Sequence, residues 1–150
     1  MVMKSALPLV AFVALGAAAL LAAAGTSKPP NLGSSAVSWE EVQDKPSNGL
    51  SRQVFRAPTA TLDELELHVT TLAPGAMPHP PHQHPEEEII IVKEGTVEAI
   101  QNGASRRLGP GSVIFEAANE PHTIRNVGDI PAVYHVIKWN SPGTLKTKGK

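Results

Sequence analysis

The chain has 150 residues, with 13 Lys and Arg against 14 Asp and Glu, so its formal net charge at pH 7 is −1. This near-neutral balance excludes a broadly basic surface of the kind that recruits nucleic acid or an anionic membrane. The sequence contains no Cys, which excludes disulfides and thiolate metal ligands. Any metal site must therefore consist of His and carboxylate side chains.

Residues 1–24 have the pattern of a secretory signal peptide. Lys4 is the only charged residue before residue 28, and an apolar run continues to the small residues Ala22, Ala23 and Ala24. This pattern predicts cleavage near Ala24 and a periplasmic or secreted protein with no stable membrane association afterwards. The alternative is an uncleaved signal that anchors the protein, because the run approaches the length needed to span a bilayer.

The rest of the chain is predicted to form one domain. Residues 25–37 are predicted to be a flexible leader, and the basic residues 141–150 a flexible tail. Between them, residues 38–140 contain about eight or nine short β-type runs separated by turn signals. No window in this region has the periodicity of an amphipathic helix. These observations predict an all-β barrel or sandwich.

The strands are predicted in chain order from β-propensity and alternation. The first short segment, residues 38–42, fits an edge strand or a single turn of helix. Residues 65–72 alternate most clearly, with Glu66, His68 and Thr70 on one face and apolar residues on the other. The dipeptide Asn102-Gly103 predicts a tight hairpin turn. The other strands are predicted at residues 50–55, 88–92, 96–100, 106–108, 112–115, 122–127 and 132–139.

A histidine-rich segment carries the clearest functional signal. Residues two apart on a strand point to the same face, so His82 and His84 would project together on a strand or strand edge. Glu88, four residues after His84, would point to that face as well. The four prolines among residues 78–85 predict a rigid loop or strand edge, in which the backbone would hold ligands in place in advance. Two imidazoles and a carboxylate suit a divalent transition metal, and His122 can supply a third imidazole. The residues therefore predict a metal site of three His and one Glu.

These residues resemble the two sequence motifs of the cupin superfamily. In the first motif, a Gly precedes His-x-His, three or four residues lead to a Glu, and six more lead to a second Gly. The matching residues are Gly75, His82, His84, Glu88 and Gly95. The second motif is matched by Gly111, His122 and Asn126. Its expected Pro-x-Gly turn is absent and residues 116–121 take its place, so a different local loop shape is expected there.

The resemblance implies a jelly-roll β-barrel, also called a double-stranded β-helix, with one metal ion inside. It implies four ligands: His82, His84, Glu88 and His122. The ion would be divalent manganese, iron, nickel, zinc or copper. The resemblance also implies a homodimer formed through edge strands, which would protect exposed sheet edges. Cupins include dioxygenases, isomerases, lyases and non-enzymatic binders, so the fold leaves the function open.

Three further histidines are candidate catalytic residues, because an imidazole can move protons near neutral pH. His79 lies in the proline loop, where a position on the rim without function is the alternative. His68 and His135 lie in predicted strands and would reach a substrate only if they face inward. Asn126 is expected either to line the cavity or to hold a turn by hydrogen bonds. The apolar wall of the pocket is predicted to consist of Ile90, Val92, Ile114 and Ile124.

The predicted function is that of a metal-dependent enzyme acting on a small polar metabolite. Four protein ligands leave two neighbouring positions on an octahedral metal for substrate or water. Dioxygenase, isomerase and hydrolase chemistry all fit this arrangement. The alternatives are a non-catalytic barrel that binds a small ligand or a metal, and a storage or structural barrel in which the metal only stabilises the fold.

Overall fold

The structure is a computed structural model that describes residues 29–46 and 50–144, with only the backbone for residues 43–46 and 50. The predicted signal peptide, residues 1–24, lies outside the described residues, as do the start of the predicted leader and the end of the predicted tail. The described residues form one short 3-10 helix and nine strands. In chain order these elements are η1 (Trp39–Glu41), β1 (Gln43–Pro46), β2 (Leu50–Ala57), β3 (Glu64–Leu72), β4 (Glu87–Glu94), β5 (Val97–Gln101), β6 (Ala104–Leu108), β7 (Val113–Glu116), β8 (His122–Asn126) and β9 (Ala132–Asn140).

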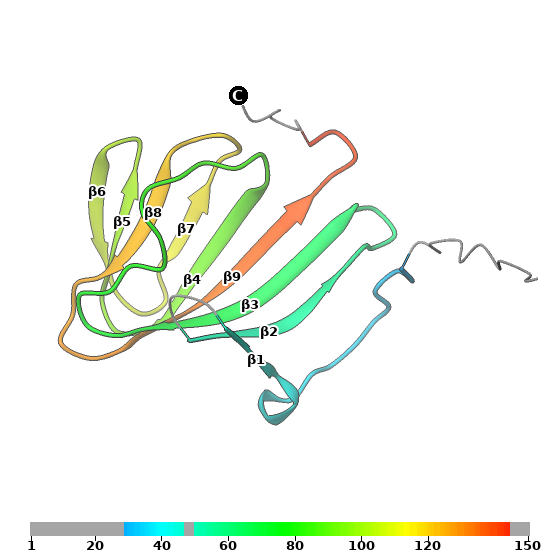
Figure 1. Cartoon of the computed structure of the whole chain (residues 1–150), viewed down its shortest axis with the longest axis horizontal. Coiled ribbons are helices and arrows are strands. Elements are labelled where there is room, and N and C mark those ends of the chain that lie inside the picture. Colours follow the sequence, from blue (N-terminus) through cyan, green and yellow to red (C-terminus); the bar gives the residue numbers. More distant parts are fainter. Residues whose placement is uncertain (1–28, 47–49, 145–150) are drawn as a thin grey trace, which may run out of the picture.

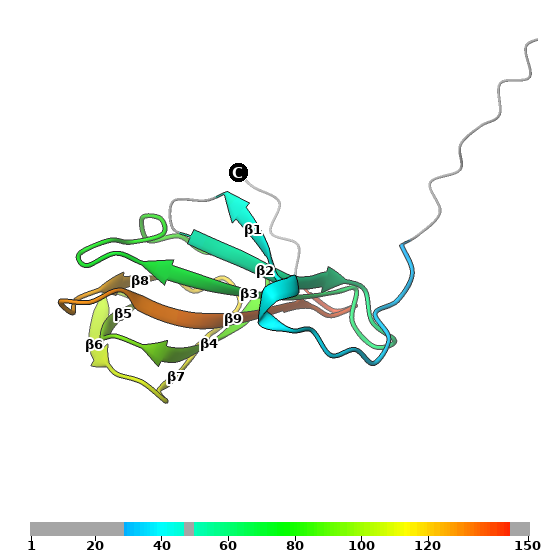
Figure 2. The same cartoon turned by 90° about the horizontal axis from the view of Figure 1, so that it is seen from below.

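The strands form two antiparallel sheets, and the expected jelly-roll barrel is confirmed. The larger sheet has the order β1-β2-β3-β9-β4-β7, and the smaller sheet has the order β6-β5-β8. Figure 1 shows β5, β6 and β8 gathered on one side of the large sheet, and Figure 2 shows the long strands β3 and β9 running together through the molecule. Of the two alternatives for residues 38–42, the structure has the helical turn.

The hydrophobic core lies between the two sheets. Strands of both sheets contribute to one buried cluster, in which the four predicted wall residues are at most 4% exposed. Burial of this apolar surface is the main favourable term in folding a small domain that has no disulfide. The buried members are Leu72, Ile90, Val92, Val97, Ala99, Ile114, Ile124, Ala132, Tyr134 and Val136.

The predicted hairpin turn is also present. Strands β5 and β6 are joined by Asn102 and Gly103, whose φ angles are 50° and 81°. Positive φ at both central residues is the geometry of a type I′ turn, which matches the natural twist of two paired strands. None of the helices among the described residues is long and apolar enough to cross a membrane.

The barrel has two chemically different ends, which we call the open end and the closed end. The open end carries charged and imidazole side chains, whereas the closed end carries apolar side chains and one buried amide. The strands run between these ends, so residues a few positions apart on one strand lie at opposite ends of the barrel. Open-end residues are Glu66, Glu88, Glu116, His122 and Lys138; closed-end residues are Leu72, Val92, Val97, Asn126 and Ala132.

Asn126 holds the closed end together. Its side chain is fully buried, and its Nδ2 donates to the carbonyl oxygens of Leu72 at 2.9 Å and Ile130 at 2.8 Å. Its Oδ1 accepts from the backbone N–H of Gly128 at 2.9 Å. Of the two roles expected for Asn126, the structure therefore shows the one in which it fixes a turn.

Candidate metal centre

The proline-rich loop and strand β8 bring two of the predicted histidines together. His82 and His122 form an isolated antiparallel bridge, with backbone hydrogen bonds of 3.1 Å and 2.8 Å in the two directions. His84 follows in the same loop, and the ligand nitrogens of all three lie within 4.8 Å of one another. The histidines therefore converge through pairing between distant segments, because β4 begins only at Glu87 and His82 and His84 precede it.

The loop that departs from the expected Pro-x-Gly turn supports this convergence. Asn119 takes the left-handed conformation with a φ of 62°, which Gly would otherwise favour and which Asn tolerates. Its backbone N–H donates to the carbonyl oxygen of His84 at 2.7 Å. The altered turn thus ties the loop before β8 to the loop that carries His84.

Backbone carbonyls orient two of the imidazole rings. The Nδ1 of His84 donates to the carbonyl oxygen of Glu86 at 2.9 Å, and the Nδ1 of His122 donates to that of Glu120 at 2.8 Å. In a neutral ring this assignment leaves Nε2 with a free lone pair. The Nε2 of His122 is buried and has no hydrogen-bond partner among the described residues. Burying an acceptor without a partner destabilises the folded protein, unless a bound ligand accepts its lone pair.

Glu88 adds negative charge beside His84. The Nε2 of His84 lies 3.7 Å from Oε2 of Glu88, so a lone pair would face a carboxylate unless a proton or a metal ion lies between them. The interaction with Glu88 raises the pKa of His84. Burial alone would raise the pKa of Glu88, but His84 and Lys138 outweigh it and lower that pKa. A divalent ion would satisfy both groups at once, and therefore the donor set fits one.

His82 completes the set as a neutral ligand. Partial burial of its ring and repulsion from His79, His122 and His84 lower the pKa of His82 to about 4. Its ring centroid is 4.8 Å from that of His122 and 5.3 Å from that of His84. His82 is therefore unprotonated at neutral pH, which is the form that binds metals.

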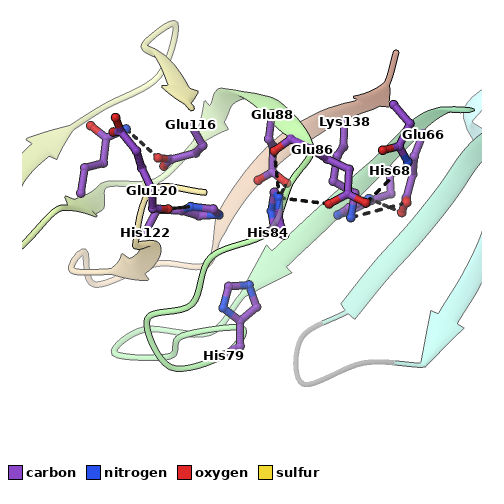
Figure 3. Close-up of polar contacts among 12 residues, drawn as sticks. Glu66, His68, His79, His84, Glu86, Glu88, Glu116, Glu120, His122 and Lys138 are labelled. Atoms are coloured by element: carbon purple, nitrogen blue, oxygen red, sulfur yellow. Dashed lines mark hydrogen bonds and ion pairs between the residues drawn. The ribbon is translucent and has the colours of Figure 1, made fainter. Parts of the chain in front are cut away.

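A row of charged side chains crosses the large sheet next to the histidines. Strand register pairs Glu66 with Lys138, Lys138 with Glu88, and Glu88 with Glu116. Figure 3 shows these four side chains following one another across β3, β9, β4 and β7. Directly opposed residues on one face lie close enough to interact. Sheet register therefore places three carboxylates and one ammonium at the open end.

Glu116 and Tyr134 are both buried beside this row. Burial raises the pKa of Glu116, and the negative charge of Glu88 adds to the effect, although a hydrogen bond from Gln101 at 2.7 Å opposes it. Burial, with a contribution from Glu88, also raises the pKa of Tyr134, so its phenol stays protonated. Glu88 and Glu116 thus have pKa values that are shifted in opposite directions. Such pairs are common where one carboxyl group must hold a proton and the other a charge.

All of these groups face one cavity of about 460 Å³, which falls in the range typical of small-molecule sites. The metal-candidate residues lie at its open end. Of the four predicted wall residues, Ile90 and Ile124 line the cavity together with Val136, whereas Val92 and Ile114 are buried in the core outside this lining. Hydroxyl groups also line it. These are Ser51, Thr70, Thr123 and Tyr134.

The three candidate catalytic histidines lie in different surroundings. His79 lines the cavity, with its ring centroid 3.9 Å from that of His82, and Figure 3 shows it on the loop, apart from the charged row. His68 also lines the cavity, and its Nδ1 lies 3.1 Å from Oε1 of Glu66. His135 lies outside the set that lines the cavity, because its neighbours Tyr134 and Val136 take the inward positions on β9.

Several lining residues were not singled out from the sequence, and those with ionisable groups next to the histidines are Glu116, Tyr134 and Lys138. Glu116 ends a strand that was expected to stop at residue 115. Strand β9 has apolar residues on both faces, so alternation alone left its inward face open. The available signal in the sequence was a single Lys, Lys138, near the end of an otherwise largely apolar strand.

Comparisons with known proteins agree with this architecture. Residues 68–138 match the cupin-domain family. A curated relative, dimethylsulfoniopropionate lyase DddQ of Ruegeria pomeroyi, is 39% identical over 86 residues, which are 57% of this chain and 40% of the lyase. A second, the transcriptional activator RhaS of Mannheimia succiniciproducens, is 34% identical over 62 residues, which are 41% of this chain and 23% of the activator. The chain thus spans less than half of the length of either relative.

Solved structures share the fold at low sequence identity. The crystal structure of a predicted oxalate decarboxylase from Thermotoga maritima superposes with a TM-score of 0.59 at 20% identity, covering 71% of this chain and 99% of that one. At this identity the likeness concerns the fold alone. Residues 68–138 of this chain are therefore similar to the cupin-domain family, and the described residues have the fold of a cupin-type jelly-roll β-barrel.

Proposed function

We propose that the cavity binds one divalent transition metal ion through His82, His84 and His122, with Glu88 as the fourth ligand. The observation that carries this proposal is the buried Nε2 of His122, which has no hydrogen-bond partner in the described part of the chain and lies within 4.8 Å of nitrogens of two other imidazoles. The hydrogen bonds from Nδ1 of His84 and His122 to backbone carbonyls support it, because they select the metal-binding tautomer. Manganese, iron, nickel, zinc and copper are all compatible with these donors.

We infer that the protein uses this ion as a metal-dependent enzyme for a small polar metabolite. A bound ion would act as a Lewis acid on an oxygen of the substrate. Around it, Ile90, Ile124 and Val136 exclude water from part of the cavity. Glu116, whose raised pKa suits proton transfer, can hold a proton on its carboxyl group. His79 at the rim and Tyr134 in the wall offer two further proton-carrying groups.

Lyase chemistry joins the dioxygenase, isomerase and hydrolase types as a candidate reaction. The support is the similarity to dimethylsulfoniopropionate lyase, which covers 57% of this chain. A lyase needs a base and a polarising group but no oxidant, and the cavity contains candidate bases. Dimethylsulfoniopropionate is therefore the first compound to test as a substrate.

The test begins with metal content. Purified protein is analysed for bound metal beside His82→Ala and His122→Ala, with His135→Ala as a matched control outside the cavity. We expect about one ion per chain in the wild type and in His135→Ala, and loss of the ion in the other two. Consumption of dimethylsulfoniopropionate is then followed with and without chelator. Wild-type protein that takes up no metal even after reconstitution would contradict the proposal.

A second candidate function is a non-catalytic barrel that binds a small ligand. The specific observation in its favour is the similarity to a transcriptional activator over 62 residues. In that case the metal-loaded protein would bind small polar compounds reversibly and leave them chemically unchanged. Ligand-observed NMR over several hours separates the two candidates, since an enzyme converts the compound and a binder does not.

We further propose an extracytoplasmic location, for which the apolar run and the Ala-rich end of residues 1–24 are the support. Cell fractionation with N-terminal sequencing tests this. A mature chain that starts near Gly25 in the periplasm or medium is the expected result, and a full-length chain in the membrane fraction would favour the anchor.

A homodimer is also proposed. Its support is an apolar patch at the β7 edge of the large sheet, where Ile91 is 36%, Val113 62% and Phe115 51% exposed. Patches and edges of this kind are usually covered in a stable protein. Sedimentation should give a dimer for the wild type and a shift toward monomer for Phe115→Ser.

A further inference from the structure

Lys138 has an unusual place in the cavity. It is the single Lys or Arg among the described residues that line the cavity, and every other formal charge there belongs to Glu or to a titratable His. Its position between Glu66 and Glu88 in the cross-strand row follows from the register of β9 with β3 and β4. The ammonium therefore lies next to the carboxylate that neighbours the metal-candidate histidines.

Its neighbours use little of the bonding capacity of this ammonium. An ammonium has three N–H donors. The nearest described carboxylate oxygen, Oε2 of Glu66, lies 3.8 Å from Nζ, which is too far for a hydrogen bond. Glu66 also faces Arg56, whose Nη1 lies 3.7 Å from the same oxygen. Glu66 thus shares its negative charge between at least these two cations, and Lys138 keeps N–H donors for a ligand.

Metal binding would free Lys138 further. In the metal-free protein the register of β9 with β4 places Lys138 directly opposite Glu88, so the two opposite charges are neighbours. When Glu88 instead binds a metal ion, the ion neutralises the charge of the carboxylate. The ammonium of Lys138 then has less negative charge beside it. An anionic group that enters the cavity would restore that counter-charge at a distance where opposite charges attract strongly in a partly desolvated site.

The wall next to Lys138 indicates the size and polarity of such a ligand. Two positions along their strands, Val136 and Ile90 pair with each other and form an apolar floor below the charged row. A short hydrocarbon chain fits against such a floor. Because three carboxylates already face the cavity, one negative charge is balanced there more readily than two. These features favour a monocarboxylate over a phosphate dianion.

We propose that Lys138 anchors the carboxylate of a short-chain substrate whose second polar group is bound at the metal-candidate histidines. This inference rests on the proposed function and adds the substrate class to it. Lys138 is then the residue that determines specificity, because it selects acids over neutral compounds of the same shape. The competing explanation is that Lys138 only neutralises Glu66 and Glu88.

The experiment compares a carboxylate with its neutral amide. The probes are 3-hydroxypropionate and 3-hydroxypropanamide, and their affinities for the Mn²⁺-loaded protein are measured by paramagnetic relaxation of the probe protons. Wild type is compared with Lys138→Met, which keeps the aliphatic stem without charge, and with Lys138→Arg, which keeps the charge. Lys93→Met is the matched control, because Lys93 is about half exposed and lies outside the cavity lining.

We expect the wild type to bind the acid about tenfold more tightly than the amide, as one charge-assisted hydrogen bond would provide. Lys138→Met should remove this preference, while Lys138→Arg and Lys93→Met retain it. The ratio of the two affinities is independent of the fraction of folded protein, which circular dichroism checks separately. A preference that survives in Lys138→Met, or a wild type without preference, would overturn the proposal.

Mn²⁺ uptake is measured beforehand by electron paramagnetic resonance, so that the two proposals fail separately. If the wild type takes up neither Mn²⁺ nor any of the other four candidate ions, the metal-site proposal fails and the same two probes are titrated into metal-free protein by saturation-transfer NMR. An acid preference that Lys138→Met removes would still support the role of Lys138 there. Equal binding of both probes would overturn it.

Discussion

The two ends of the barrel satisfy their polar groups in opposite ways. At the closed end, the amide of Asn126 makes three hydrogen bonds to backbone groups of the same protein. At the open end, the Nε2 of His122 has no partner among the described residues, and two carboxylates, Glu88 and Glu116, occupy opposed positions on neighbouring strands. The closed end is thus arranged for stability, whereas the open end keeps bonding capacity for a ligand. Proteins commonly give up stability at functional sites in this way.

The largest effect should come from a methyl group added at the closed end. In Gly95→Ala the new Cβ would lie 2.7 Å from Cα of Ala132 and 2.8 Å from the carbonyl oxygen of Pro131, and both are backbone atoms. We expect a loss of roughly 3 kcal/mol in the free energy of unfolding. Gly75→Ala is the control, since its φ is also positive at 78° but nothing lies within 4 Å. It should lose about 1 kcal/mol from backbone strain alone. Equal losses in denaturant titrations would contradict the packing explanation.

Removal of the Asn126 amide should have a similar or slightly smaller effect. Asn126→Ala leaves the buried carbonyls of Leu72 and Ile130 and the N–H of Gly128 without this partner. We expect a loss of about 2 to 3 kcal/mol by urea denaturation. Asn31→Ala, at an exposed position of the N-terminal segment, should change little. A small loss in Asn126→Ala would mean that the closed end does not depend on the amide.

At the open end, replacing one carboxylate by an uncharged amide should instead stabilise the metal-free protein. Because burial raises the pKa of Glu116, folding favours its protonated form. That contribution is present below the ordinary pKa near 4.5 and is lost as pH rises through the folded-state pKa. Glu116→Gln should therefore raise the Tm of chelator-treated protein at pH 7 and have little effect at pH 4, with a smaller magnitude than the closed-end changes.

The neighbouring carboxylate supplies the opposite control. The pKa of Glu88 is lowered in the folded state, so its stabilising contribution is present above the ordinary pKa and is lost as pH falls through the folded-state value. Glu88→Gln should accordingly lower the Tm at pH 7 in the same metal-free protein. If both variants shift the Tm in the same direction, the two carboxylates do not differ as the structure indicates.

The smallest effect is expected outside both ends. Arg106 and Arg107 were predicted to be ordinary surface charges, and both are exposed on the edge strand β6. Arg107→Ser should change the free energy of unfolding by less than about 0.5 kcal/mol and leave metal uptake unchanged. A larger change would show that this edge takes part in an interface.

Much of the fold could be predicted because its signals are local. The alternation of residues 65–72 and the turn at Asn102-Gly103 each depend on a few consecutive residues, and the structure has both features. The positions of His82, His84, Glu88 and His122 relative to known motifs also predicted which residues would gather, and the three histidines do converge. That they bind a metal stays a prediction.

Other features of the site could not be predicted because they depend on pairing between distant segments. Strand parity suggested that His82, His84 and Glu88 share a strand, but the bridge between His82 and His122 is what joins the histidines. Alternation along the strand likewise could not show which face of β9 points inward. His135 was therefore a candidate catalytic residue, and Lys138 was not. The same local pattern fits either face until the second sheet covers one of them.

By itself, the sequence determined the strand order along the chain and the kinds of donor available, because propensity, turn chemistry and the absence of Cys are properties of short segments. Only the tertiary structure decided the charged row of Glu66, Lys138, Glu88 and Glu116, since register between four strands sets which side chains face each other. It also decided that Asn126 supports the closed end and that the Nε2 of His122 has no hydrogen-bond partner within residues 29–46 and 50–144. Burial and cross-strand neighbours arise only when distant segments pack together, and these control both the pKa values and the ligand chemistry of the open end.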